Sequence, residues 1–103
     1  MKLADLHPGW VHCGGPDVHH ADGSEVPRRE QVGVAFDCPC GCDQRCFIPF
    51  ANPPDGLGPI EPSEPGWNRT GDTFETLTLT PSILRVGGCG WHGFITGGEV
   101  RAA

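Results

Sequence analysis

Two clusters of soft metal ligands stand out in the sequence. The first comprises Cys38, Cys40 and Cys42, which place three thiols within five residues. The second is the Cys-x-x-His pair of Cys89 and His92. Thiolates and an imidazole offered as two short groups suit a tetrahedral zinc ion better than other common ions. The sequence therefore predicts a single Zn²⁺ site.

Zinc takes four ligands, and the two clusters offer five. Successive side chains near a tight turn diverge, so three thiols from one cluster would crowd a single ion. We expect two thiolates from the first cluster, with Cys38 and Cys42 favoured and Cys40 as a near neighbour or a substitute. Cys89 and His92 would complete a site of three thiolates and one imidazole. Four protein ligands leave no open position, so the predicted ion is structural.

A second group of metal-binding residue types lies in the N-terminal part of the chain. It contains His12, Cys13, His19 and His20, and Cys46 could join it. The spacing of these residues matches no known ligand pattern, and an exposed polar loop accounts for them better. We therefore favour an exposed loop over a second metal site.

The length and composition indicate a single domain that needs additional stabilisation. A chain of 103 residues has a thin core. Sixteen glycines and eleven prolines approach a disordered composition, but three tryptophans and five phenylalanines favour a folded protein. A metal ion would supply the stability that so small a core lacks. We expect residues 1–30 to form an irregular N-terminal arm and residues 31–103 to form the zinc-binding β domain.

The apolar pattern predicts a mainly β fold, namely a small zinc-stapled antiparallel sheet with long Pro/Gly loops. Residues 31–37 alternate as a half-buried strand, and residues 45–50 form the returning strand, so the first cysteine cluster is expected at a hairpin tip. Residues 51–66 are expected to be a mobile surface loop. The remaining predictions are a strand over 73–80, an extended stretch over 83–86, a turn at Gly87-Gly88 and a hairpin over 94–100.

Pro81 and Ser82 follow the predicted strand over 73–80 and are expected to end it. Serine and proline are common in turns, because the hydroxyl bonds the local backbone and the ring presets φ. Ser82 has no histidine at any local spacing typical of nucleophilic catalysis. We therefore interpret Ser82 as a turn former rather than a nucleophile.

The charge and hydropathy pattern narrow the classes of partner. The formal net charge is −6, and an acidic surface repels phosphate, so nucleic-acid binding is disfavoured. No apolar run approaches the roughly 18 residues of a membrane span, and the first residues lack the apolar region of a secretory signal. Six cysteines in such a chain indicate a reducing compartment, where metal binding outranks disulfides. We expect a cytoplasmic protein that binds a protein partner and neither nucleic acid nor a membrane.

The two cysteine clusters occur together with several other short segments, namely Cys38-Pro39, Gly41-Cys42, Trp67, residues 77–83, Cys89, residues 92–95 and Gly98. In combination these segments resemble a family of small proteins of unknown function. Its members occur in tailed-phage genomes, often mislabelled as ammonia monooxygenase, and in bacterial operons carrying ubiquitin-like genes. The resemblance covers about residues 36–100 and implies a zinc-bound β fold and a phage or bacterial origin, without an established activity. Cys40 departs from the family pattern as an insertion, and Gly90-Trp91 separate a Cys-His pair that is often contiguous.

Three functions are compatible with these features. The sequence favours a zinc-binding structural or interaction module, a phage or bacterial accessory protein that acts through protein contacts rather than as an enzyme. The second is a metal-dependent hydrolase or nuclease, in which Asp17, Asp22 and the spare histidines supply an open site or a general base. Against it, the chain lacks the metalloprotease and deaminase signatures. The third is a structural component of a virion, in which case the protein would be found in the host cytoplasm or the particle.

Overall fold

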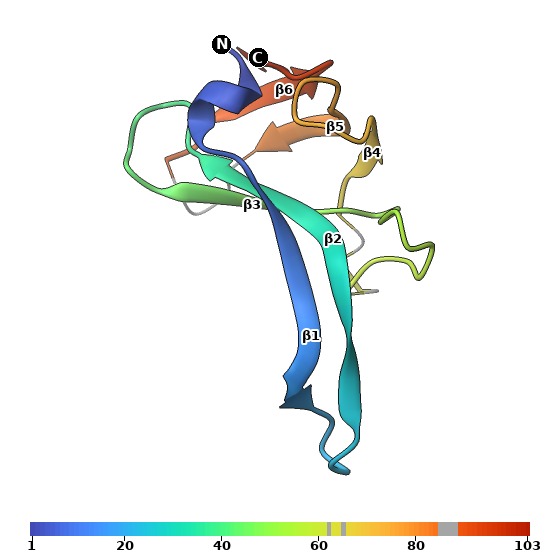
Figure 1. The fold of residues 1–103 in the computed structure, drawn as a ribbon. Helices are drawn as coiled ribbons and strands as arrows, with labels where there is room; N and C mark the ends of the chain where they lie inside the picture. The colour runs from blue at the N-terminus through green and yellow to red at the C-terminus, as the bar shows by residue number, and fades with distance from the viewer. Residues whose placement is uncertain (62, 65, 85–88) are drawn as a thin grey trace.

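The computed structural model describes residues 1–61, 63–64, 66–84 and 89–103, which form two antiparallel sheets (Figure 1). The sheets have the strand orders β1-β2-β3 and β4-β5-β6-β7. The predicted mainly β class is confirmed, as is the hairpin over residues 94–100. No described helix is long and apolar enough to cross a membrane. The elements are the 3₁₀ helix η1 (Leu3–Leu6), β1 (Gly9–His19), β2 (Glu25–Asp37), β3 (Arg45–Pro49), β4 (Asn68–Thr70), β5 (Thr78–Leu84), β6 (His92–Thr96) and β7 (Glu99–Ala102).

The first sheet contains the strands on which the cysteine loop is built. Val32, Val34 and Phe36 are all buried on β2, as the alternating sequence predicted. β3 pairs antiparallel with the end of β2 in a register that places Ile48 opposite Val34. The hairpin predicted over residues 31–50 is therefore confirmed, with the three clustered cysteines in the loop between its strands.

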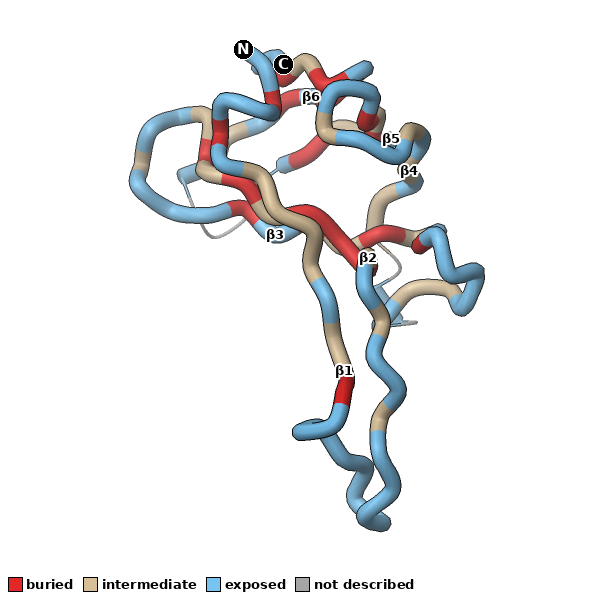
Figure 2. The backbone as a smooth tube through the Cα atoms, in the orientation of Figure 1, coloured by how far each residue is buried: buried red, intermediate tan, exposed pale blue. Residues whose placement is uncertain are grey.

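A long two-stranded ribbon extends from the body of the protein (Figure 1). It consists of β1 and the first half of β2, and its distal part is largely exposed (Figure 2). The sequence predicted an irregular segment over residues 1–30, whereas the structure has paired strands there. Register shifts along β1 break the two-residue alternation, so no apolar pattern marks these strands. Gly14 lies at one shift with φ +75°, and a Cβ atom there would lie 2.2 Å from the carbonyl oxygen of Pro27.

Residues 73–76, predicted to begin a strand, form a turn instead. The hydroxyl groups of Thr73 and Thr76 lie 2.8 Å apart, and the amide of Thr76 donates to the carbonyl of Thr73 at 3.2 Å. Such local bonds compete with strand pairing. The turn also directs Phe74 onto the ring of Trp10, with the ring centroids 4.4 Å apart.

β5 extends beyond the point at which the sequence predicted its end. The strand continues through Pro81 and Ser82, so the prediction that these residues end it is wrong. Proline is tolerated here because the register of β5 is irregular at this point, and an irregular position needs no ladder donor. The extended stretch predicted over 83–86 is described only in part, because residues 85–88 lie outside the described residues. The predicted Gly87-Gly88 turn lies there as well.

Phe50 lies where the two sheets meet. Its side chain is fully buried, and its ring makes an edge contact with Trp10 at a centroid distance of 6.2 Å. Its backbone forms a parallel bridge with Trp67, which follows the long loop and precedes β4. The core is therefore shared between the sheets. It contains Leu3, Leu6, Val34, Phe36, Cys38, Cys46, Ile48, Phe50, Leu77, Leu79, Ile83, Ile95 and Val100.

The loop over residues 51–66 is fastened at described points, although the sequence suggested a mobile segment. Arg29 of β2 donates two hydrogen bonds to the carboxylate of Asp55, at 2.7 and 3.0 Å. Asn52 donates to the carbonyl of Arg69 at 3.0 Å and accepts from its amide at 2.8 Å. These contacts fix the path by which the chain passes from the first sheet to the second.

Truncating Phe50 to alanine should destabilise the protein by about 3–5 kcal/mol, because the change leaves a cavity between the two sheets. The matched control is Phe47→Ala on β3, the strand that Phe50 directly follows, because the Phe47 side chain is 49% exposed. That change should cost less than about 1 kcal/mol. Chemical denaturation of both variants measures the difference, and equal losses would contradict the shared core.

Candidate functional site

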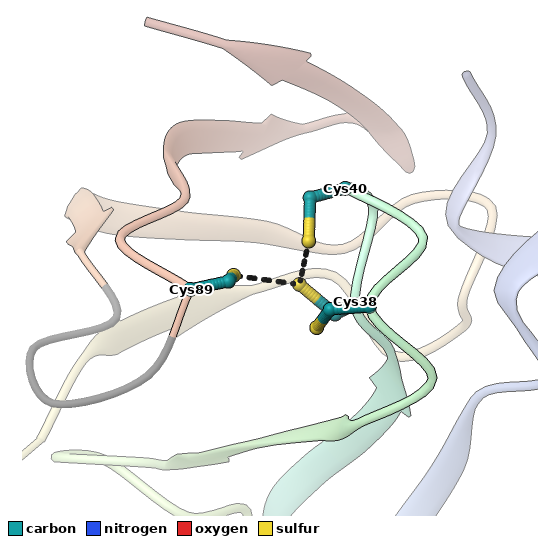
Figure 3. A group of neighbouring side chains, drawn as sticks. Cys38, Cys40 and Cys89 are labelled. Carbon is teal, nitrogen blue, oxygen red and sulfur yellow. Dashed lines mark hydrogen bonds between the residues drawn. The ribbon is translucent and has the colours of Figure 1, made fainter.

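Four cysteine side chains converge at one point. Figure 3 shows three of them, Cys38, Cys40 and Cys89. Cys38, Cys40 and Cys42 come from the loop between β2 and β3, and Cys89 precedes β6. The Sγ atom of Cys38 lies 3.3 Å from that of Cys40 and 3.4 Å from that of Cys89. All four sulfur atoms lie within 4.8 Å of one another. This four-cysteine group joins segments that are 51 positions apart in the chain.

The conformation of the loop explains how three thiols from one short cluster can meet. Gly41 and Asp43 have left-handed φ angles of +83° and +61°, which curl the chain around the sulfur atoms. The amide of Gly41 donates to the carbonyl of Cys38 at 3.1 Å, and the amide of Cys38 donates to Gln44 at 2.8 Å. The crowding expected from the sequence is therefore relieved by the turn. Cys40, expected as a near neighbour or a substitute, is one of the four grouped thiols.

The spacing and chemistry of this group suit a tetrahedral thiophilic ion. Zinc–sulfur bonds of about 2.3 Å in a tetrahedron place the sulfur atoms about 3.8 Å apart. The sulfur–sulfur distances of 3.3 and 3.4 Å, with the others up to 4.8 Å, bracket that value. Hydrogen bonding with Cys89, and then with Cys38 and Cys42, raises the pKa of Cys40 to about 12. The four residues could therefore hold a metal ion, which would take the place of the shared thiol protons.

His92, predicted as the imidazole ligand, lies elsewhere in the structure. Its Nε2 atom lies 2.9 Å from the Oγ atom of Ser82, and the group of four ligands does not include it. The grouped side chains are four thiols, whereas the sequence predicted three thiols and one imidazole. The N-terminal candidates are distributed along the β1–β2 ribbon and its turn. Within the described part of the chain, no metal-binding group contains His12, Cys13, His19, His20 or Cys46.

The Ser82–His92 contact results from a bulge in β5. Leu79 pairs with Ile95 and Ile83 pairs with Gly93, so β5 has three residues where β6 has one. An insertion of this kind bends the strand and re-aims its side chains, and bulges are frequent beside active sites. Ser82 lies in the bulge, and its hydroxyl faces the first residue of β6. The interpretation of Ser82 as a turn former is therefore wrong.

Both members of the serine–histidine pair are held through their backbones. The indole Nε1 of Trp67 donates to the carbonyl of Ser82 at 3.2 Å. The carbonyl of His92 accepts from the amide of Ala103 at 2.8 Å, which ties it to the end of β7. Gly93, which follows His92, must be glycine, because a Cβ atom there would lie 2.3 Å from the carbonyl oxygen of Arg101 on β7. Ser82 is half-buried and His92 is exposed, so both side chains are accessible to solvent.

Sequence reasoning missed this pair for an identifiable reason. Ser82 and His92 are ten positions apart, and no general motif uses that spacing. Their approach depends on the register of two strands and on the length of a bulge. The only local signal is a Pro-Ser pair inside a strongly β-forming segment, where neither residue favours regular pairing.

The fold and the site together define a small β protein that has a metal-competent thiol group and a solvent-accessible serine–histidine pair. The chain belongs to the BubE family, described as "Bacterial ubiquitination-like system serine protease (BubE)", whose model it matches over residues 16–103. No curated protein and no solved structure matches it. The family match supports the bacterial, ubiquitin-related side of the resemblance seen in the sequence. It gives no support to the phage and virion context.

The metal ligands can be distinguished by two substitutions. Cys40→Ser should lose bound zinc, whereas His92→Ala should retain about one equivalent, because only the thiol faces the other sulfur atoms. Cys13→Ser, at a half-buried thiol on the β1–β2 ribbon, is the matched control and should also retain zinc. The measurement is elemental zinc per chain after purification in zinc-containing buffer. Loss of zinc from His92→Ala with retention in Cys40→Ser would favour the three-thiolate, one-imidazole site.

Proposed function

We propose that this protein is a serine protease in which Ser82 is the nucleophile and His92 is the general base. The observation that carries the proposal is the 2.9 Å distance between the Oγ atom of Ser82 and the Nε2 atom of His92. A nucleophile and its base are expected within about 2.6–3.2 Å of each other. Membership of a family described as serine proteases supports the same chemistry.

The proposed reaction is acyl transfer. As the Oγ atom of Ser82 attacks the carbonyl carbon of a peptide bond, its proton passes to Nε2 of His92. The protonated imidazole then gives this proton to the leaving amine, and the carbon–nitrogen bond breaks to leave an acyl ester on Ser82. Water, deprotonated by His92, attacks the ester and regenerates the hydroxyl. The exposure of His92 lets this water reach the imidazole.

In this proposal the four-cysteine group holds one structural Zn²⁺, with Cys38, Cys40, Cys42 and Cys89 as thiolate ligands. Four protein ligands leave no position for water or substrate, so the ion would supply cross-linking rather than catalysis. Cys89 precedes His92 by three residues, a span of at most about 10 Å of chain. The ion would therefore fix the segment that leads into the base and connect it to the loop of the first sheet.

This function combines the interaction module favoured by the sequence with an enzymatic site. A protease must bind a protein, and two large apolar side chains flank the pair on the exposed face of the second sheet. Leu84 pairs with His92 across β5 and β6 and is 51% exposed, and Phe94 is 46% exposed. The protein partner or substrate would belong to the ubiquitination-like system that the family description names. A metal-dependent hydrolase is less well supported, because the four thiols would close the ion to substrate.

A fluorophosphonate probe tests the serine–histidine assignment. Wild-type protein should be labelled on Ser82, Ser82→Ala should not be labelled, and His92→Ala should react at least about a thousandfold more slowly because the base is lost. Ser63→Ala is the matched control, since its hydroxyl lies 2.8 Å from the Oε1 atom of Glu61 rather than beside an imidazole. Intact-mass and peptide mass spectrometry measure the labelling. Undiminished labelling of Ser82→Ala would contradict the proposal.

Removal of zinc tests the structural role of the ion. Chelation under reducing conditions should abolish the cooperative unfolding transition, because structural zinc contributes on the order of 10 kcal/mol, which is comparable to the whole stability of a small domain. Restoring Zn²⁺ should restore both the transition and fluorophosphonate labelling. A chelated protein that keeps its cooperative fold would show that the four thiols do not stabilise it through a metal.

A further inference from the structure

Trp67 links the candidate nucleophile to the first sheet. Its amide donates to the carbonyl of Pro49 at 2.9 Å, and its carbonyl accepts from the amide of Ala51 at 2.7 Å. Its side chain reaches the other way, with Nε1 donating to the carbonyl of Ser82 at 3.2 Å. One residue thus contacts the end of β3 through its backbone and the bulge of β5 through its ring.

The indole takes the place of a missing strand beside Ser82. β4 pairs with β5 only as far as the Asn68–Thr80 pair, so the ladder on this side stops two residues before Ser82. A partly buried carbonyl without a partner costs about 1–3 kcal/mol, and the strand would be free to rotate to find one. The indole N–H satisfies this carbonyl and so restrains the backbone of the residue that carries the hydroxyl. Pro81 restricts φ on the preceding side.

The position of the indole is set independently of β5. Gly66 has φ +83°, and a Cβ atom there would lie 2.3 Å from the carbonyl oxygen of Pro49, so the chain approaches β3 too closely for any larger residue. Together with the two backbone hydrogen bonds, this close approach fixes Trp67 to the first sheet. The ring also packs against the core, which leaves it little freedom to move. The donor is therefore preorganised for the carbonyl it meets.

We propose that Trp67 is a positioning residue, whose indole N–H holds the β5 bulge so that the hydroxyl of Ser82 faces His92. This inference rests on the proposed serine-protease function. A purely structural tryptophan would act through the bulk of its ring, whereas a positioning tryptophan acts through the N–H. Phenylalanine keeps most of the ring and removes the donor, so Trp67→Phe separates the two roles.

The experiment uses the zinc-loaded protein and the fluorophosphonate probe. The Oγ atom of Ser82 forms a bond to phosphorus, the phosphorus–fluorine bond breaks, fluoride leaves with the electron pair, and His92 takes the hydroxyl proton. Saturation kinetics separate the maximal inactivation rate, kinact, from the half-saturating probe concentration, KI. Trp67→Phe should lower kinact between about 10- and 100-fold, because a small misplacement of a reacting group has effects of that size. KI, zinc content and the unfolding midpoint should stay close to those of the control.

Trp10→Phe is the matched control. Trp10 also packs against the core, where it stacks on Phe74 with the ring centroids 4.4 Å apart. This variant should keep the wild-type kinact, since its indole has no hydrogen bond to the serine–histidine pair. A kinact in Trp67→Phe equal to that of Trp10→Phe would overturn the proposal. A change confined to KI would also overturn it, because the residue would then contact the probe rather than position Ser82.

The outcomes for Ser82→Ala separate this inference from the proposed function. If Ser82→Ala is still labelled, both the proposed function and the role of Trp67 are contradicted. If Ser82→Ala is not labelled but Trp67→Phe keeps the control value of kinact, only the role of Trp67 is contradicted. If Trp67→Phe fails to fold, NMR on the wild-type protein provides the test. The Nε1–H resonance of Trp67 should then shift more than that of Trp10 when Ser82 is phosphonylated, and an unmoved resonance would overturn the proposal.

Discussion

The convergence of four thiols is the constraint on which the rest of the structure depends. Each sheet alone has only three or four strands, and the buried core consists of a few side chains from each. The group joins the tip of the β2–β3 hairpin to the residue from which the chain enters β6. Buried apolar contacts such as those of Phe50 hold the sheets together at another point. The orientation of one sheet on the other is therefore determined by the thiol group, by the shared core and by the hydrogen bonds of Trp67.

The geometry of the serine–histidine pair depends on the orientation of the two sheets. Ser82 belongs to the second sheet, but the donor on its carbonyl belongs to a residue bonded to the first sheet. His92 begins the strand that follows Cys89, so its position also depends on the contact between the sheets. The pair is open to water on the outer face, and apolar side chains lie beside it. In the proposed protease, a protein substrate that covered Leu84 and Phe94 would exclude water from the serine–histidine pair and strengthen the polar interactions there.

The local features of the fold could be predicted from the sequence, and the features that depend on register could not. The alternation of Val32, Val34 and Phe36 with other residues predicts a strand. A cluster of cysteines between two predicted strands indicates a hairpin tip. The β1–β2 ribbon carries no such signal, because its bulges and exposed faces remove the alternation. The sequence predicts a strand where Thr73 and Thr76 form a turn, because threonine favours both strands and local side-chain hydrogen bonds.

The candidate site could be predicted only in part, because the cysteines form local patterns whereas the serine–histidine contact depends on strand register. The cysteines could be recognised because thiol chemistry narrows the choice of partner and four of them belong to two short clusters. His92 was assigned to this group because a Cys-x-x-His spacing is typical of zinc sites. Its contact with Ser82 depends instead on how many residues of β5 face a single residue of β6. No composition or periodicity encodes that number.

At the bulge, three residues of β5 lie opposite one residue of β6. The serine–histidine contact requires this bulge, whereas the pairing of the two strands does not. A strand two residues shorter at this point would run beside β6 without interruption and would keep Leu79 and Ile83 in the core. It would also present no hydroxyl to His92. A short deletion in this segment would thus remove the proposed nucleophile from the histidine while leaving the thiol group and both sheets unchanged.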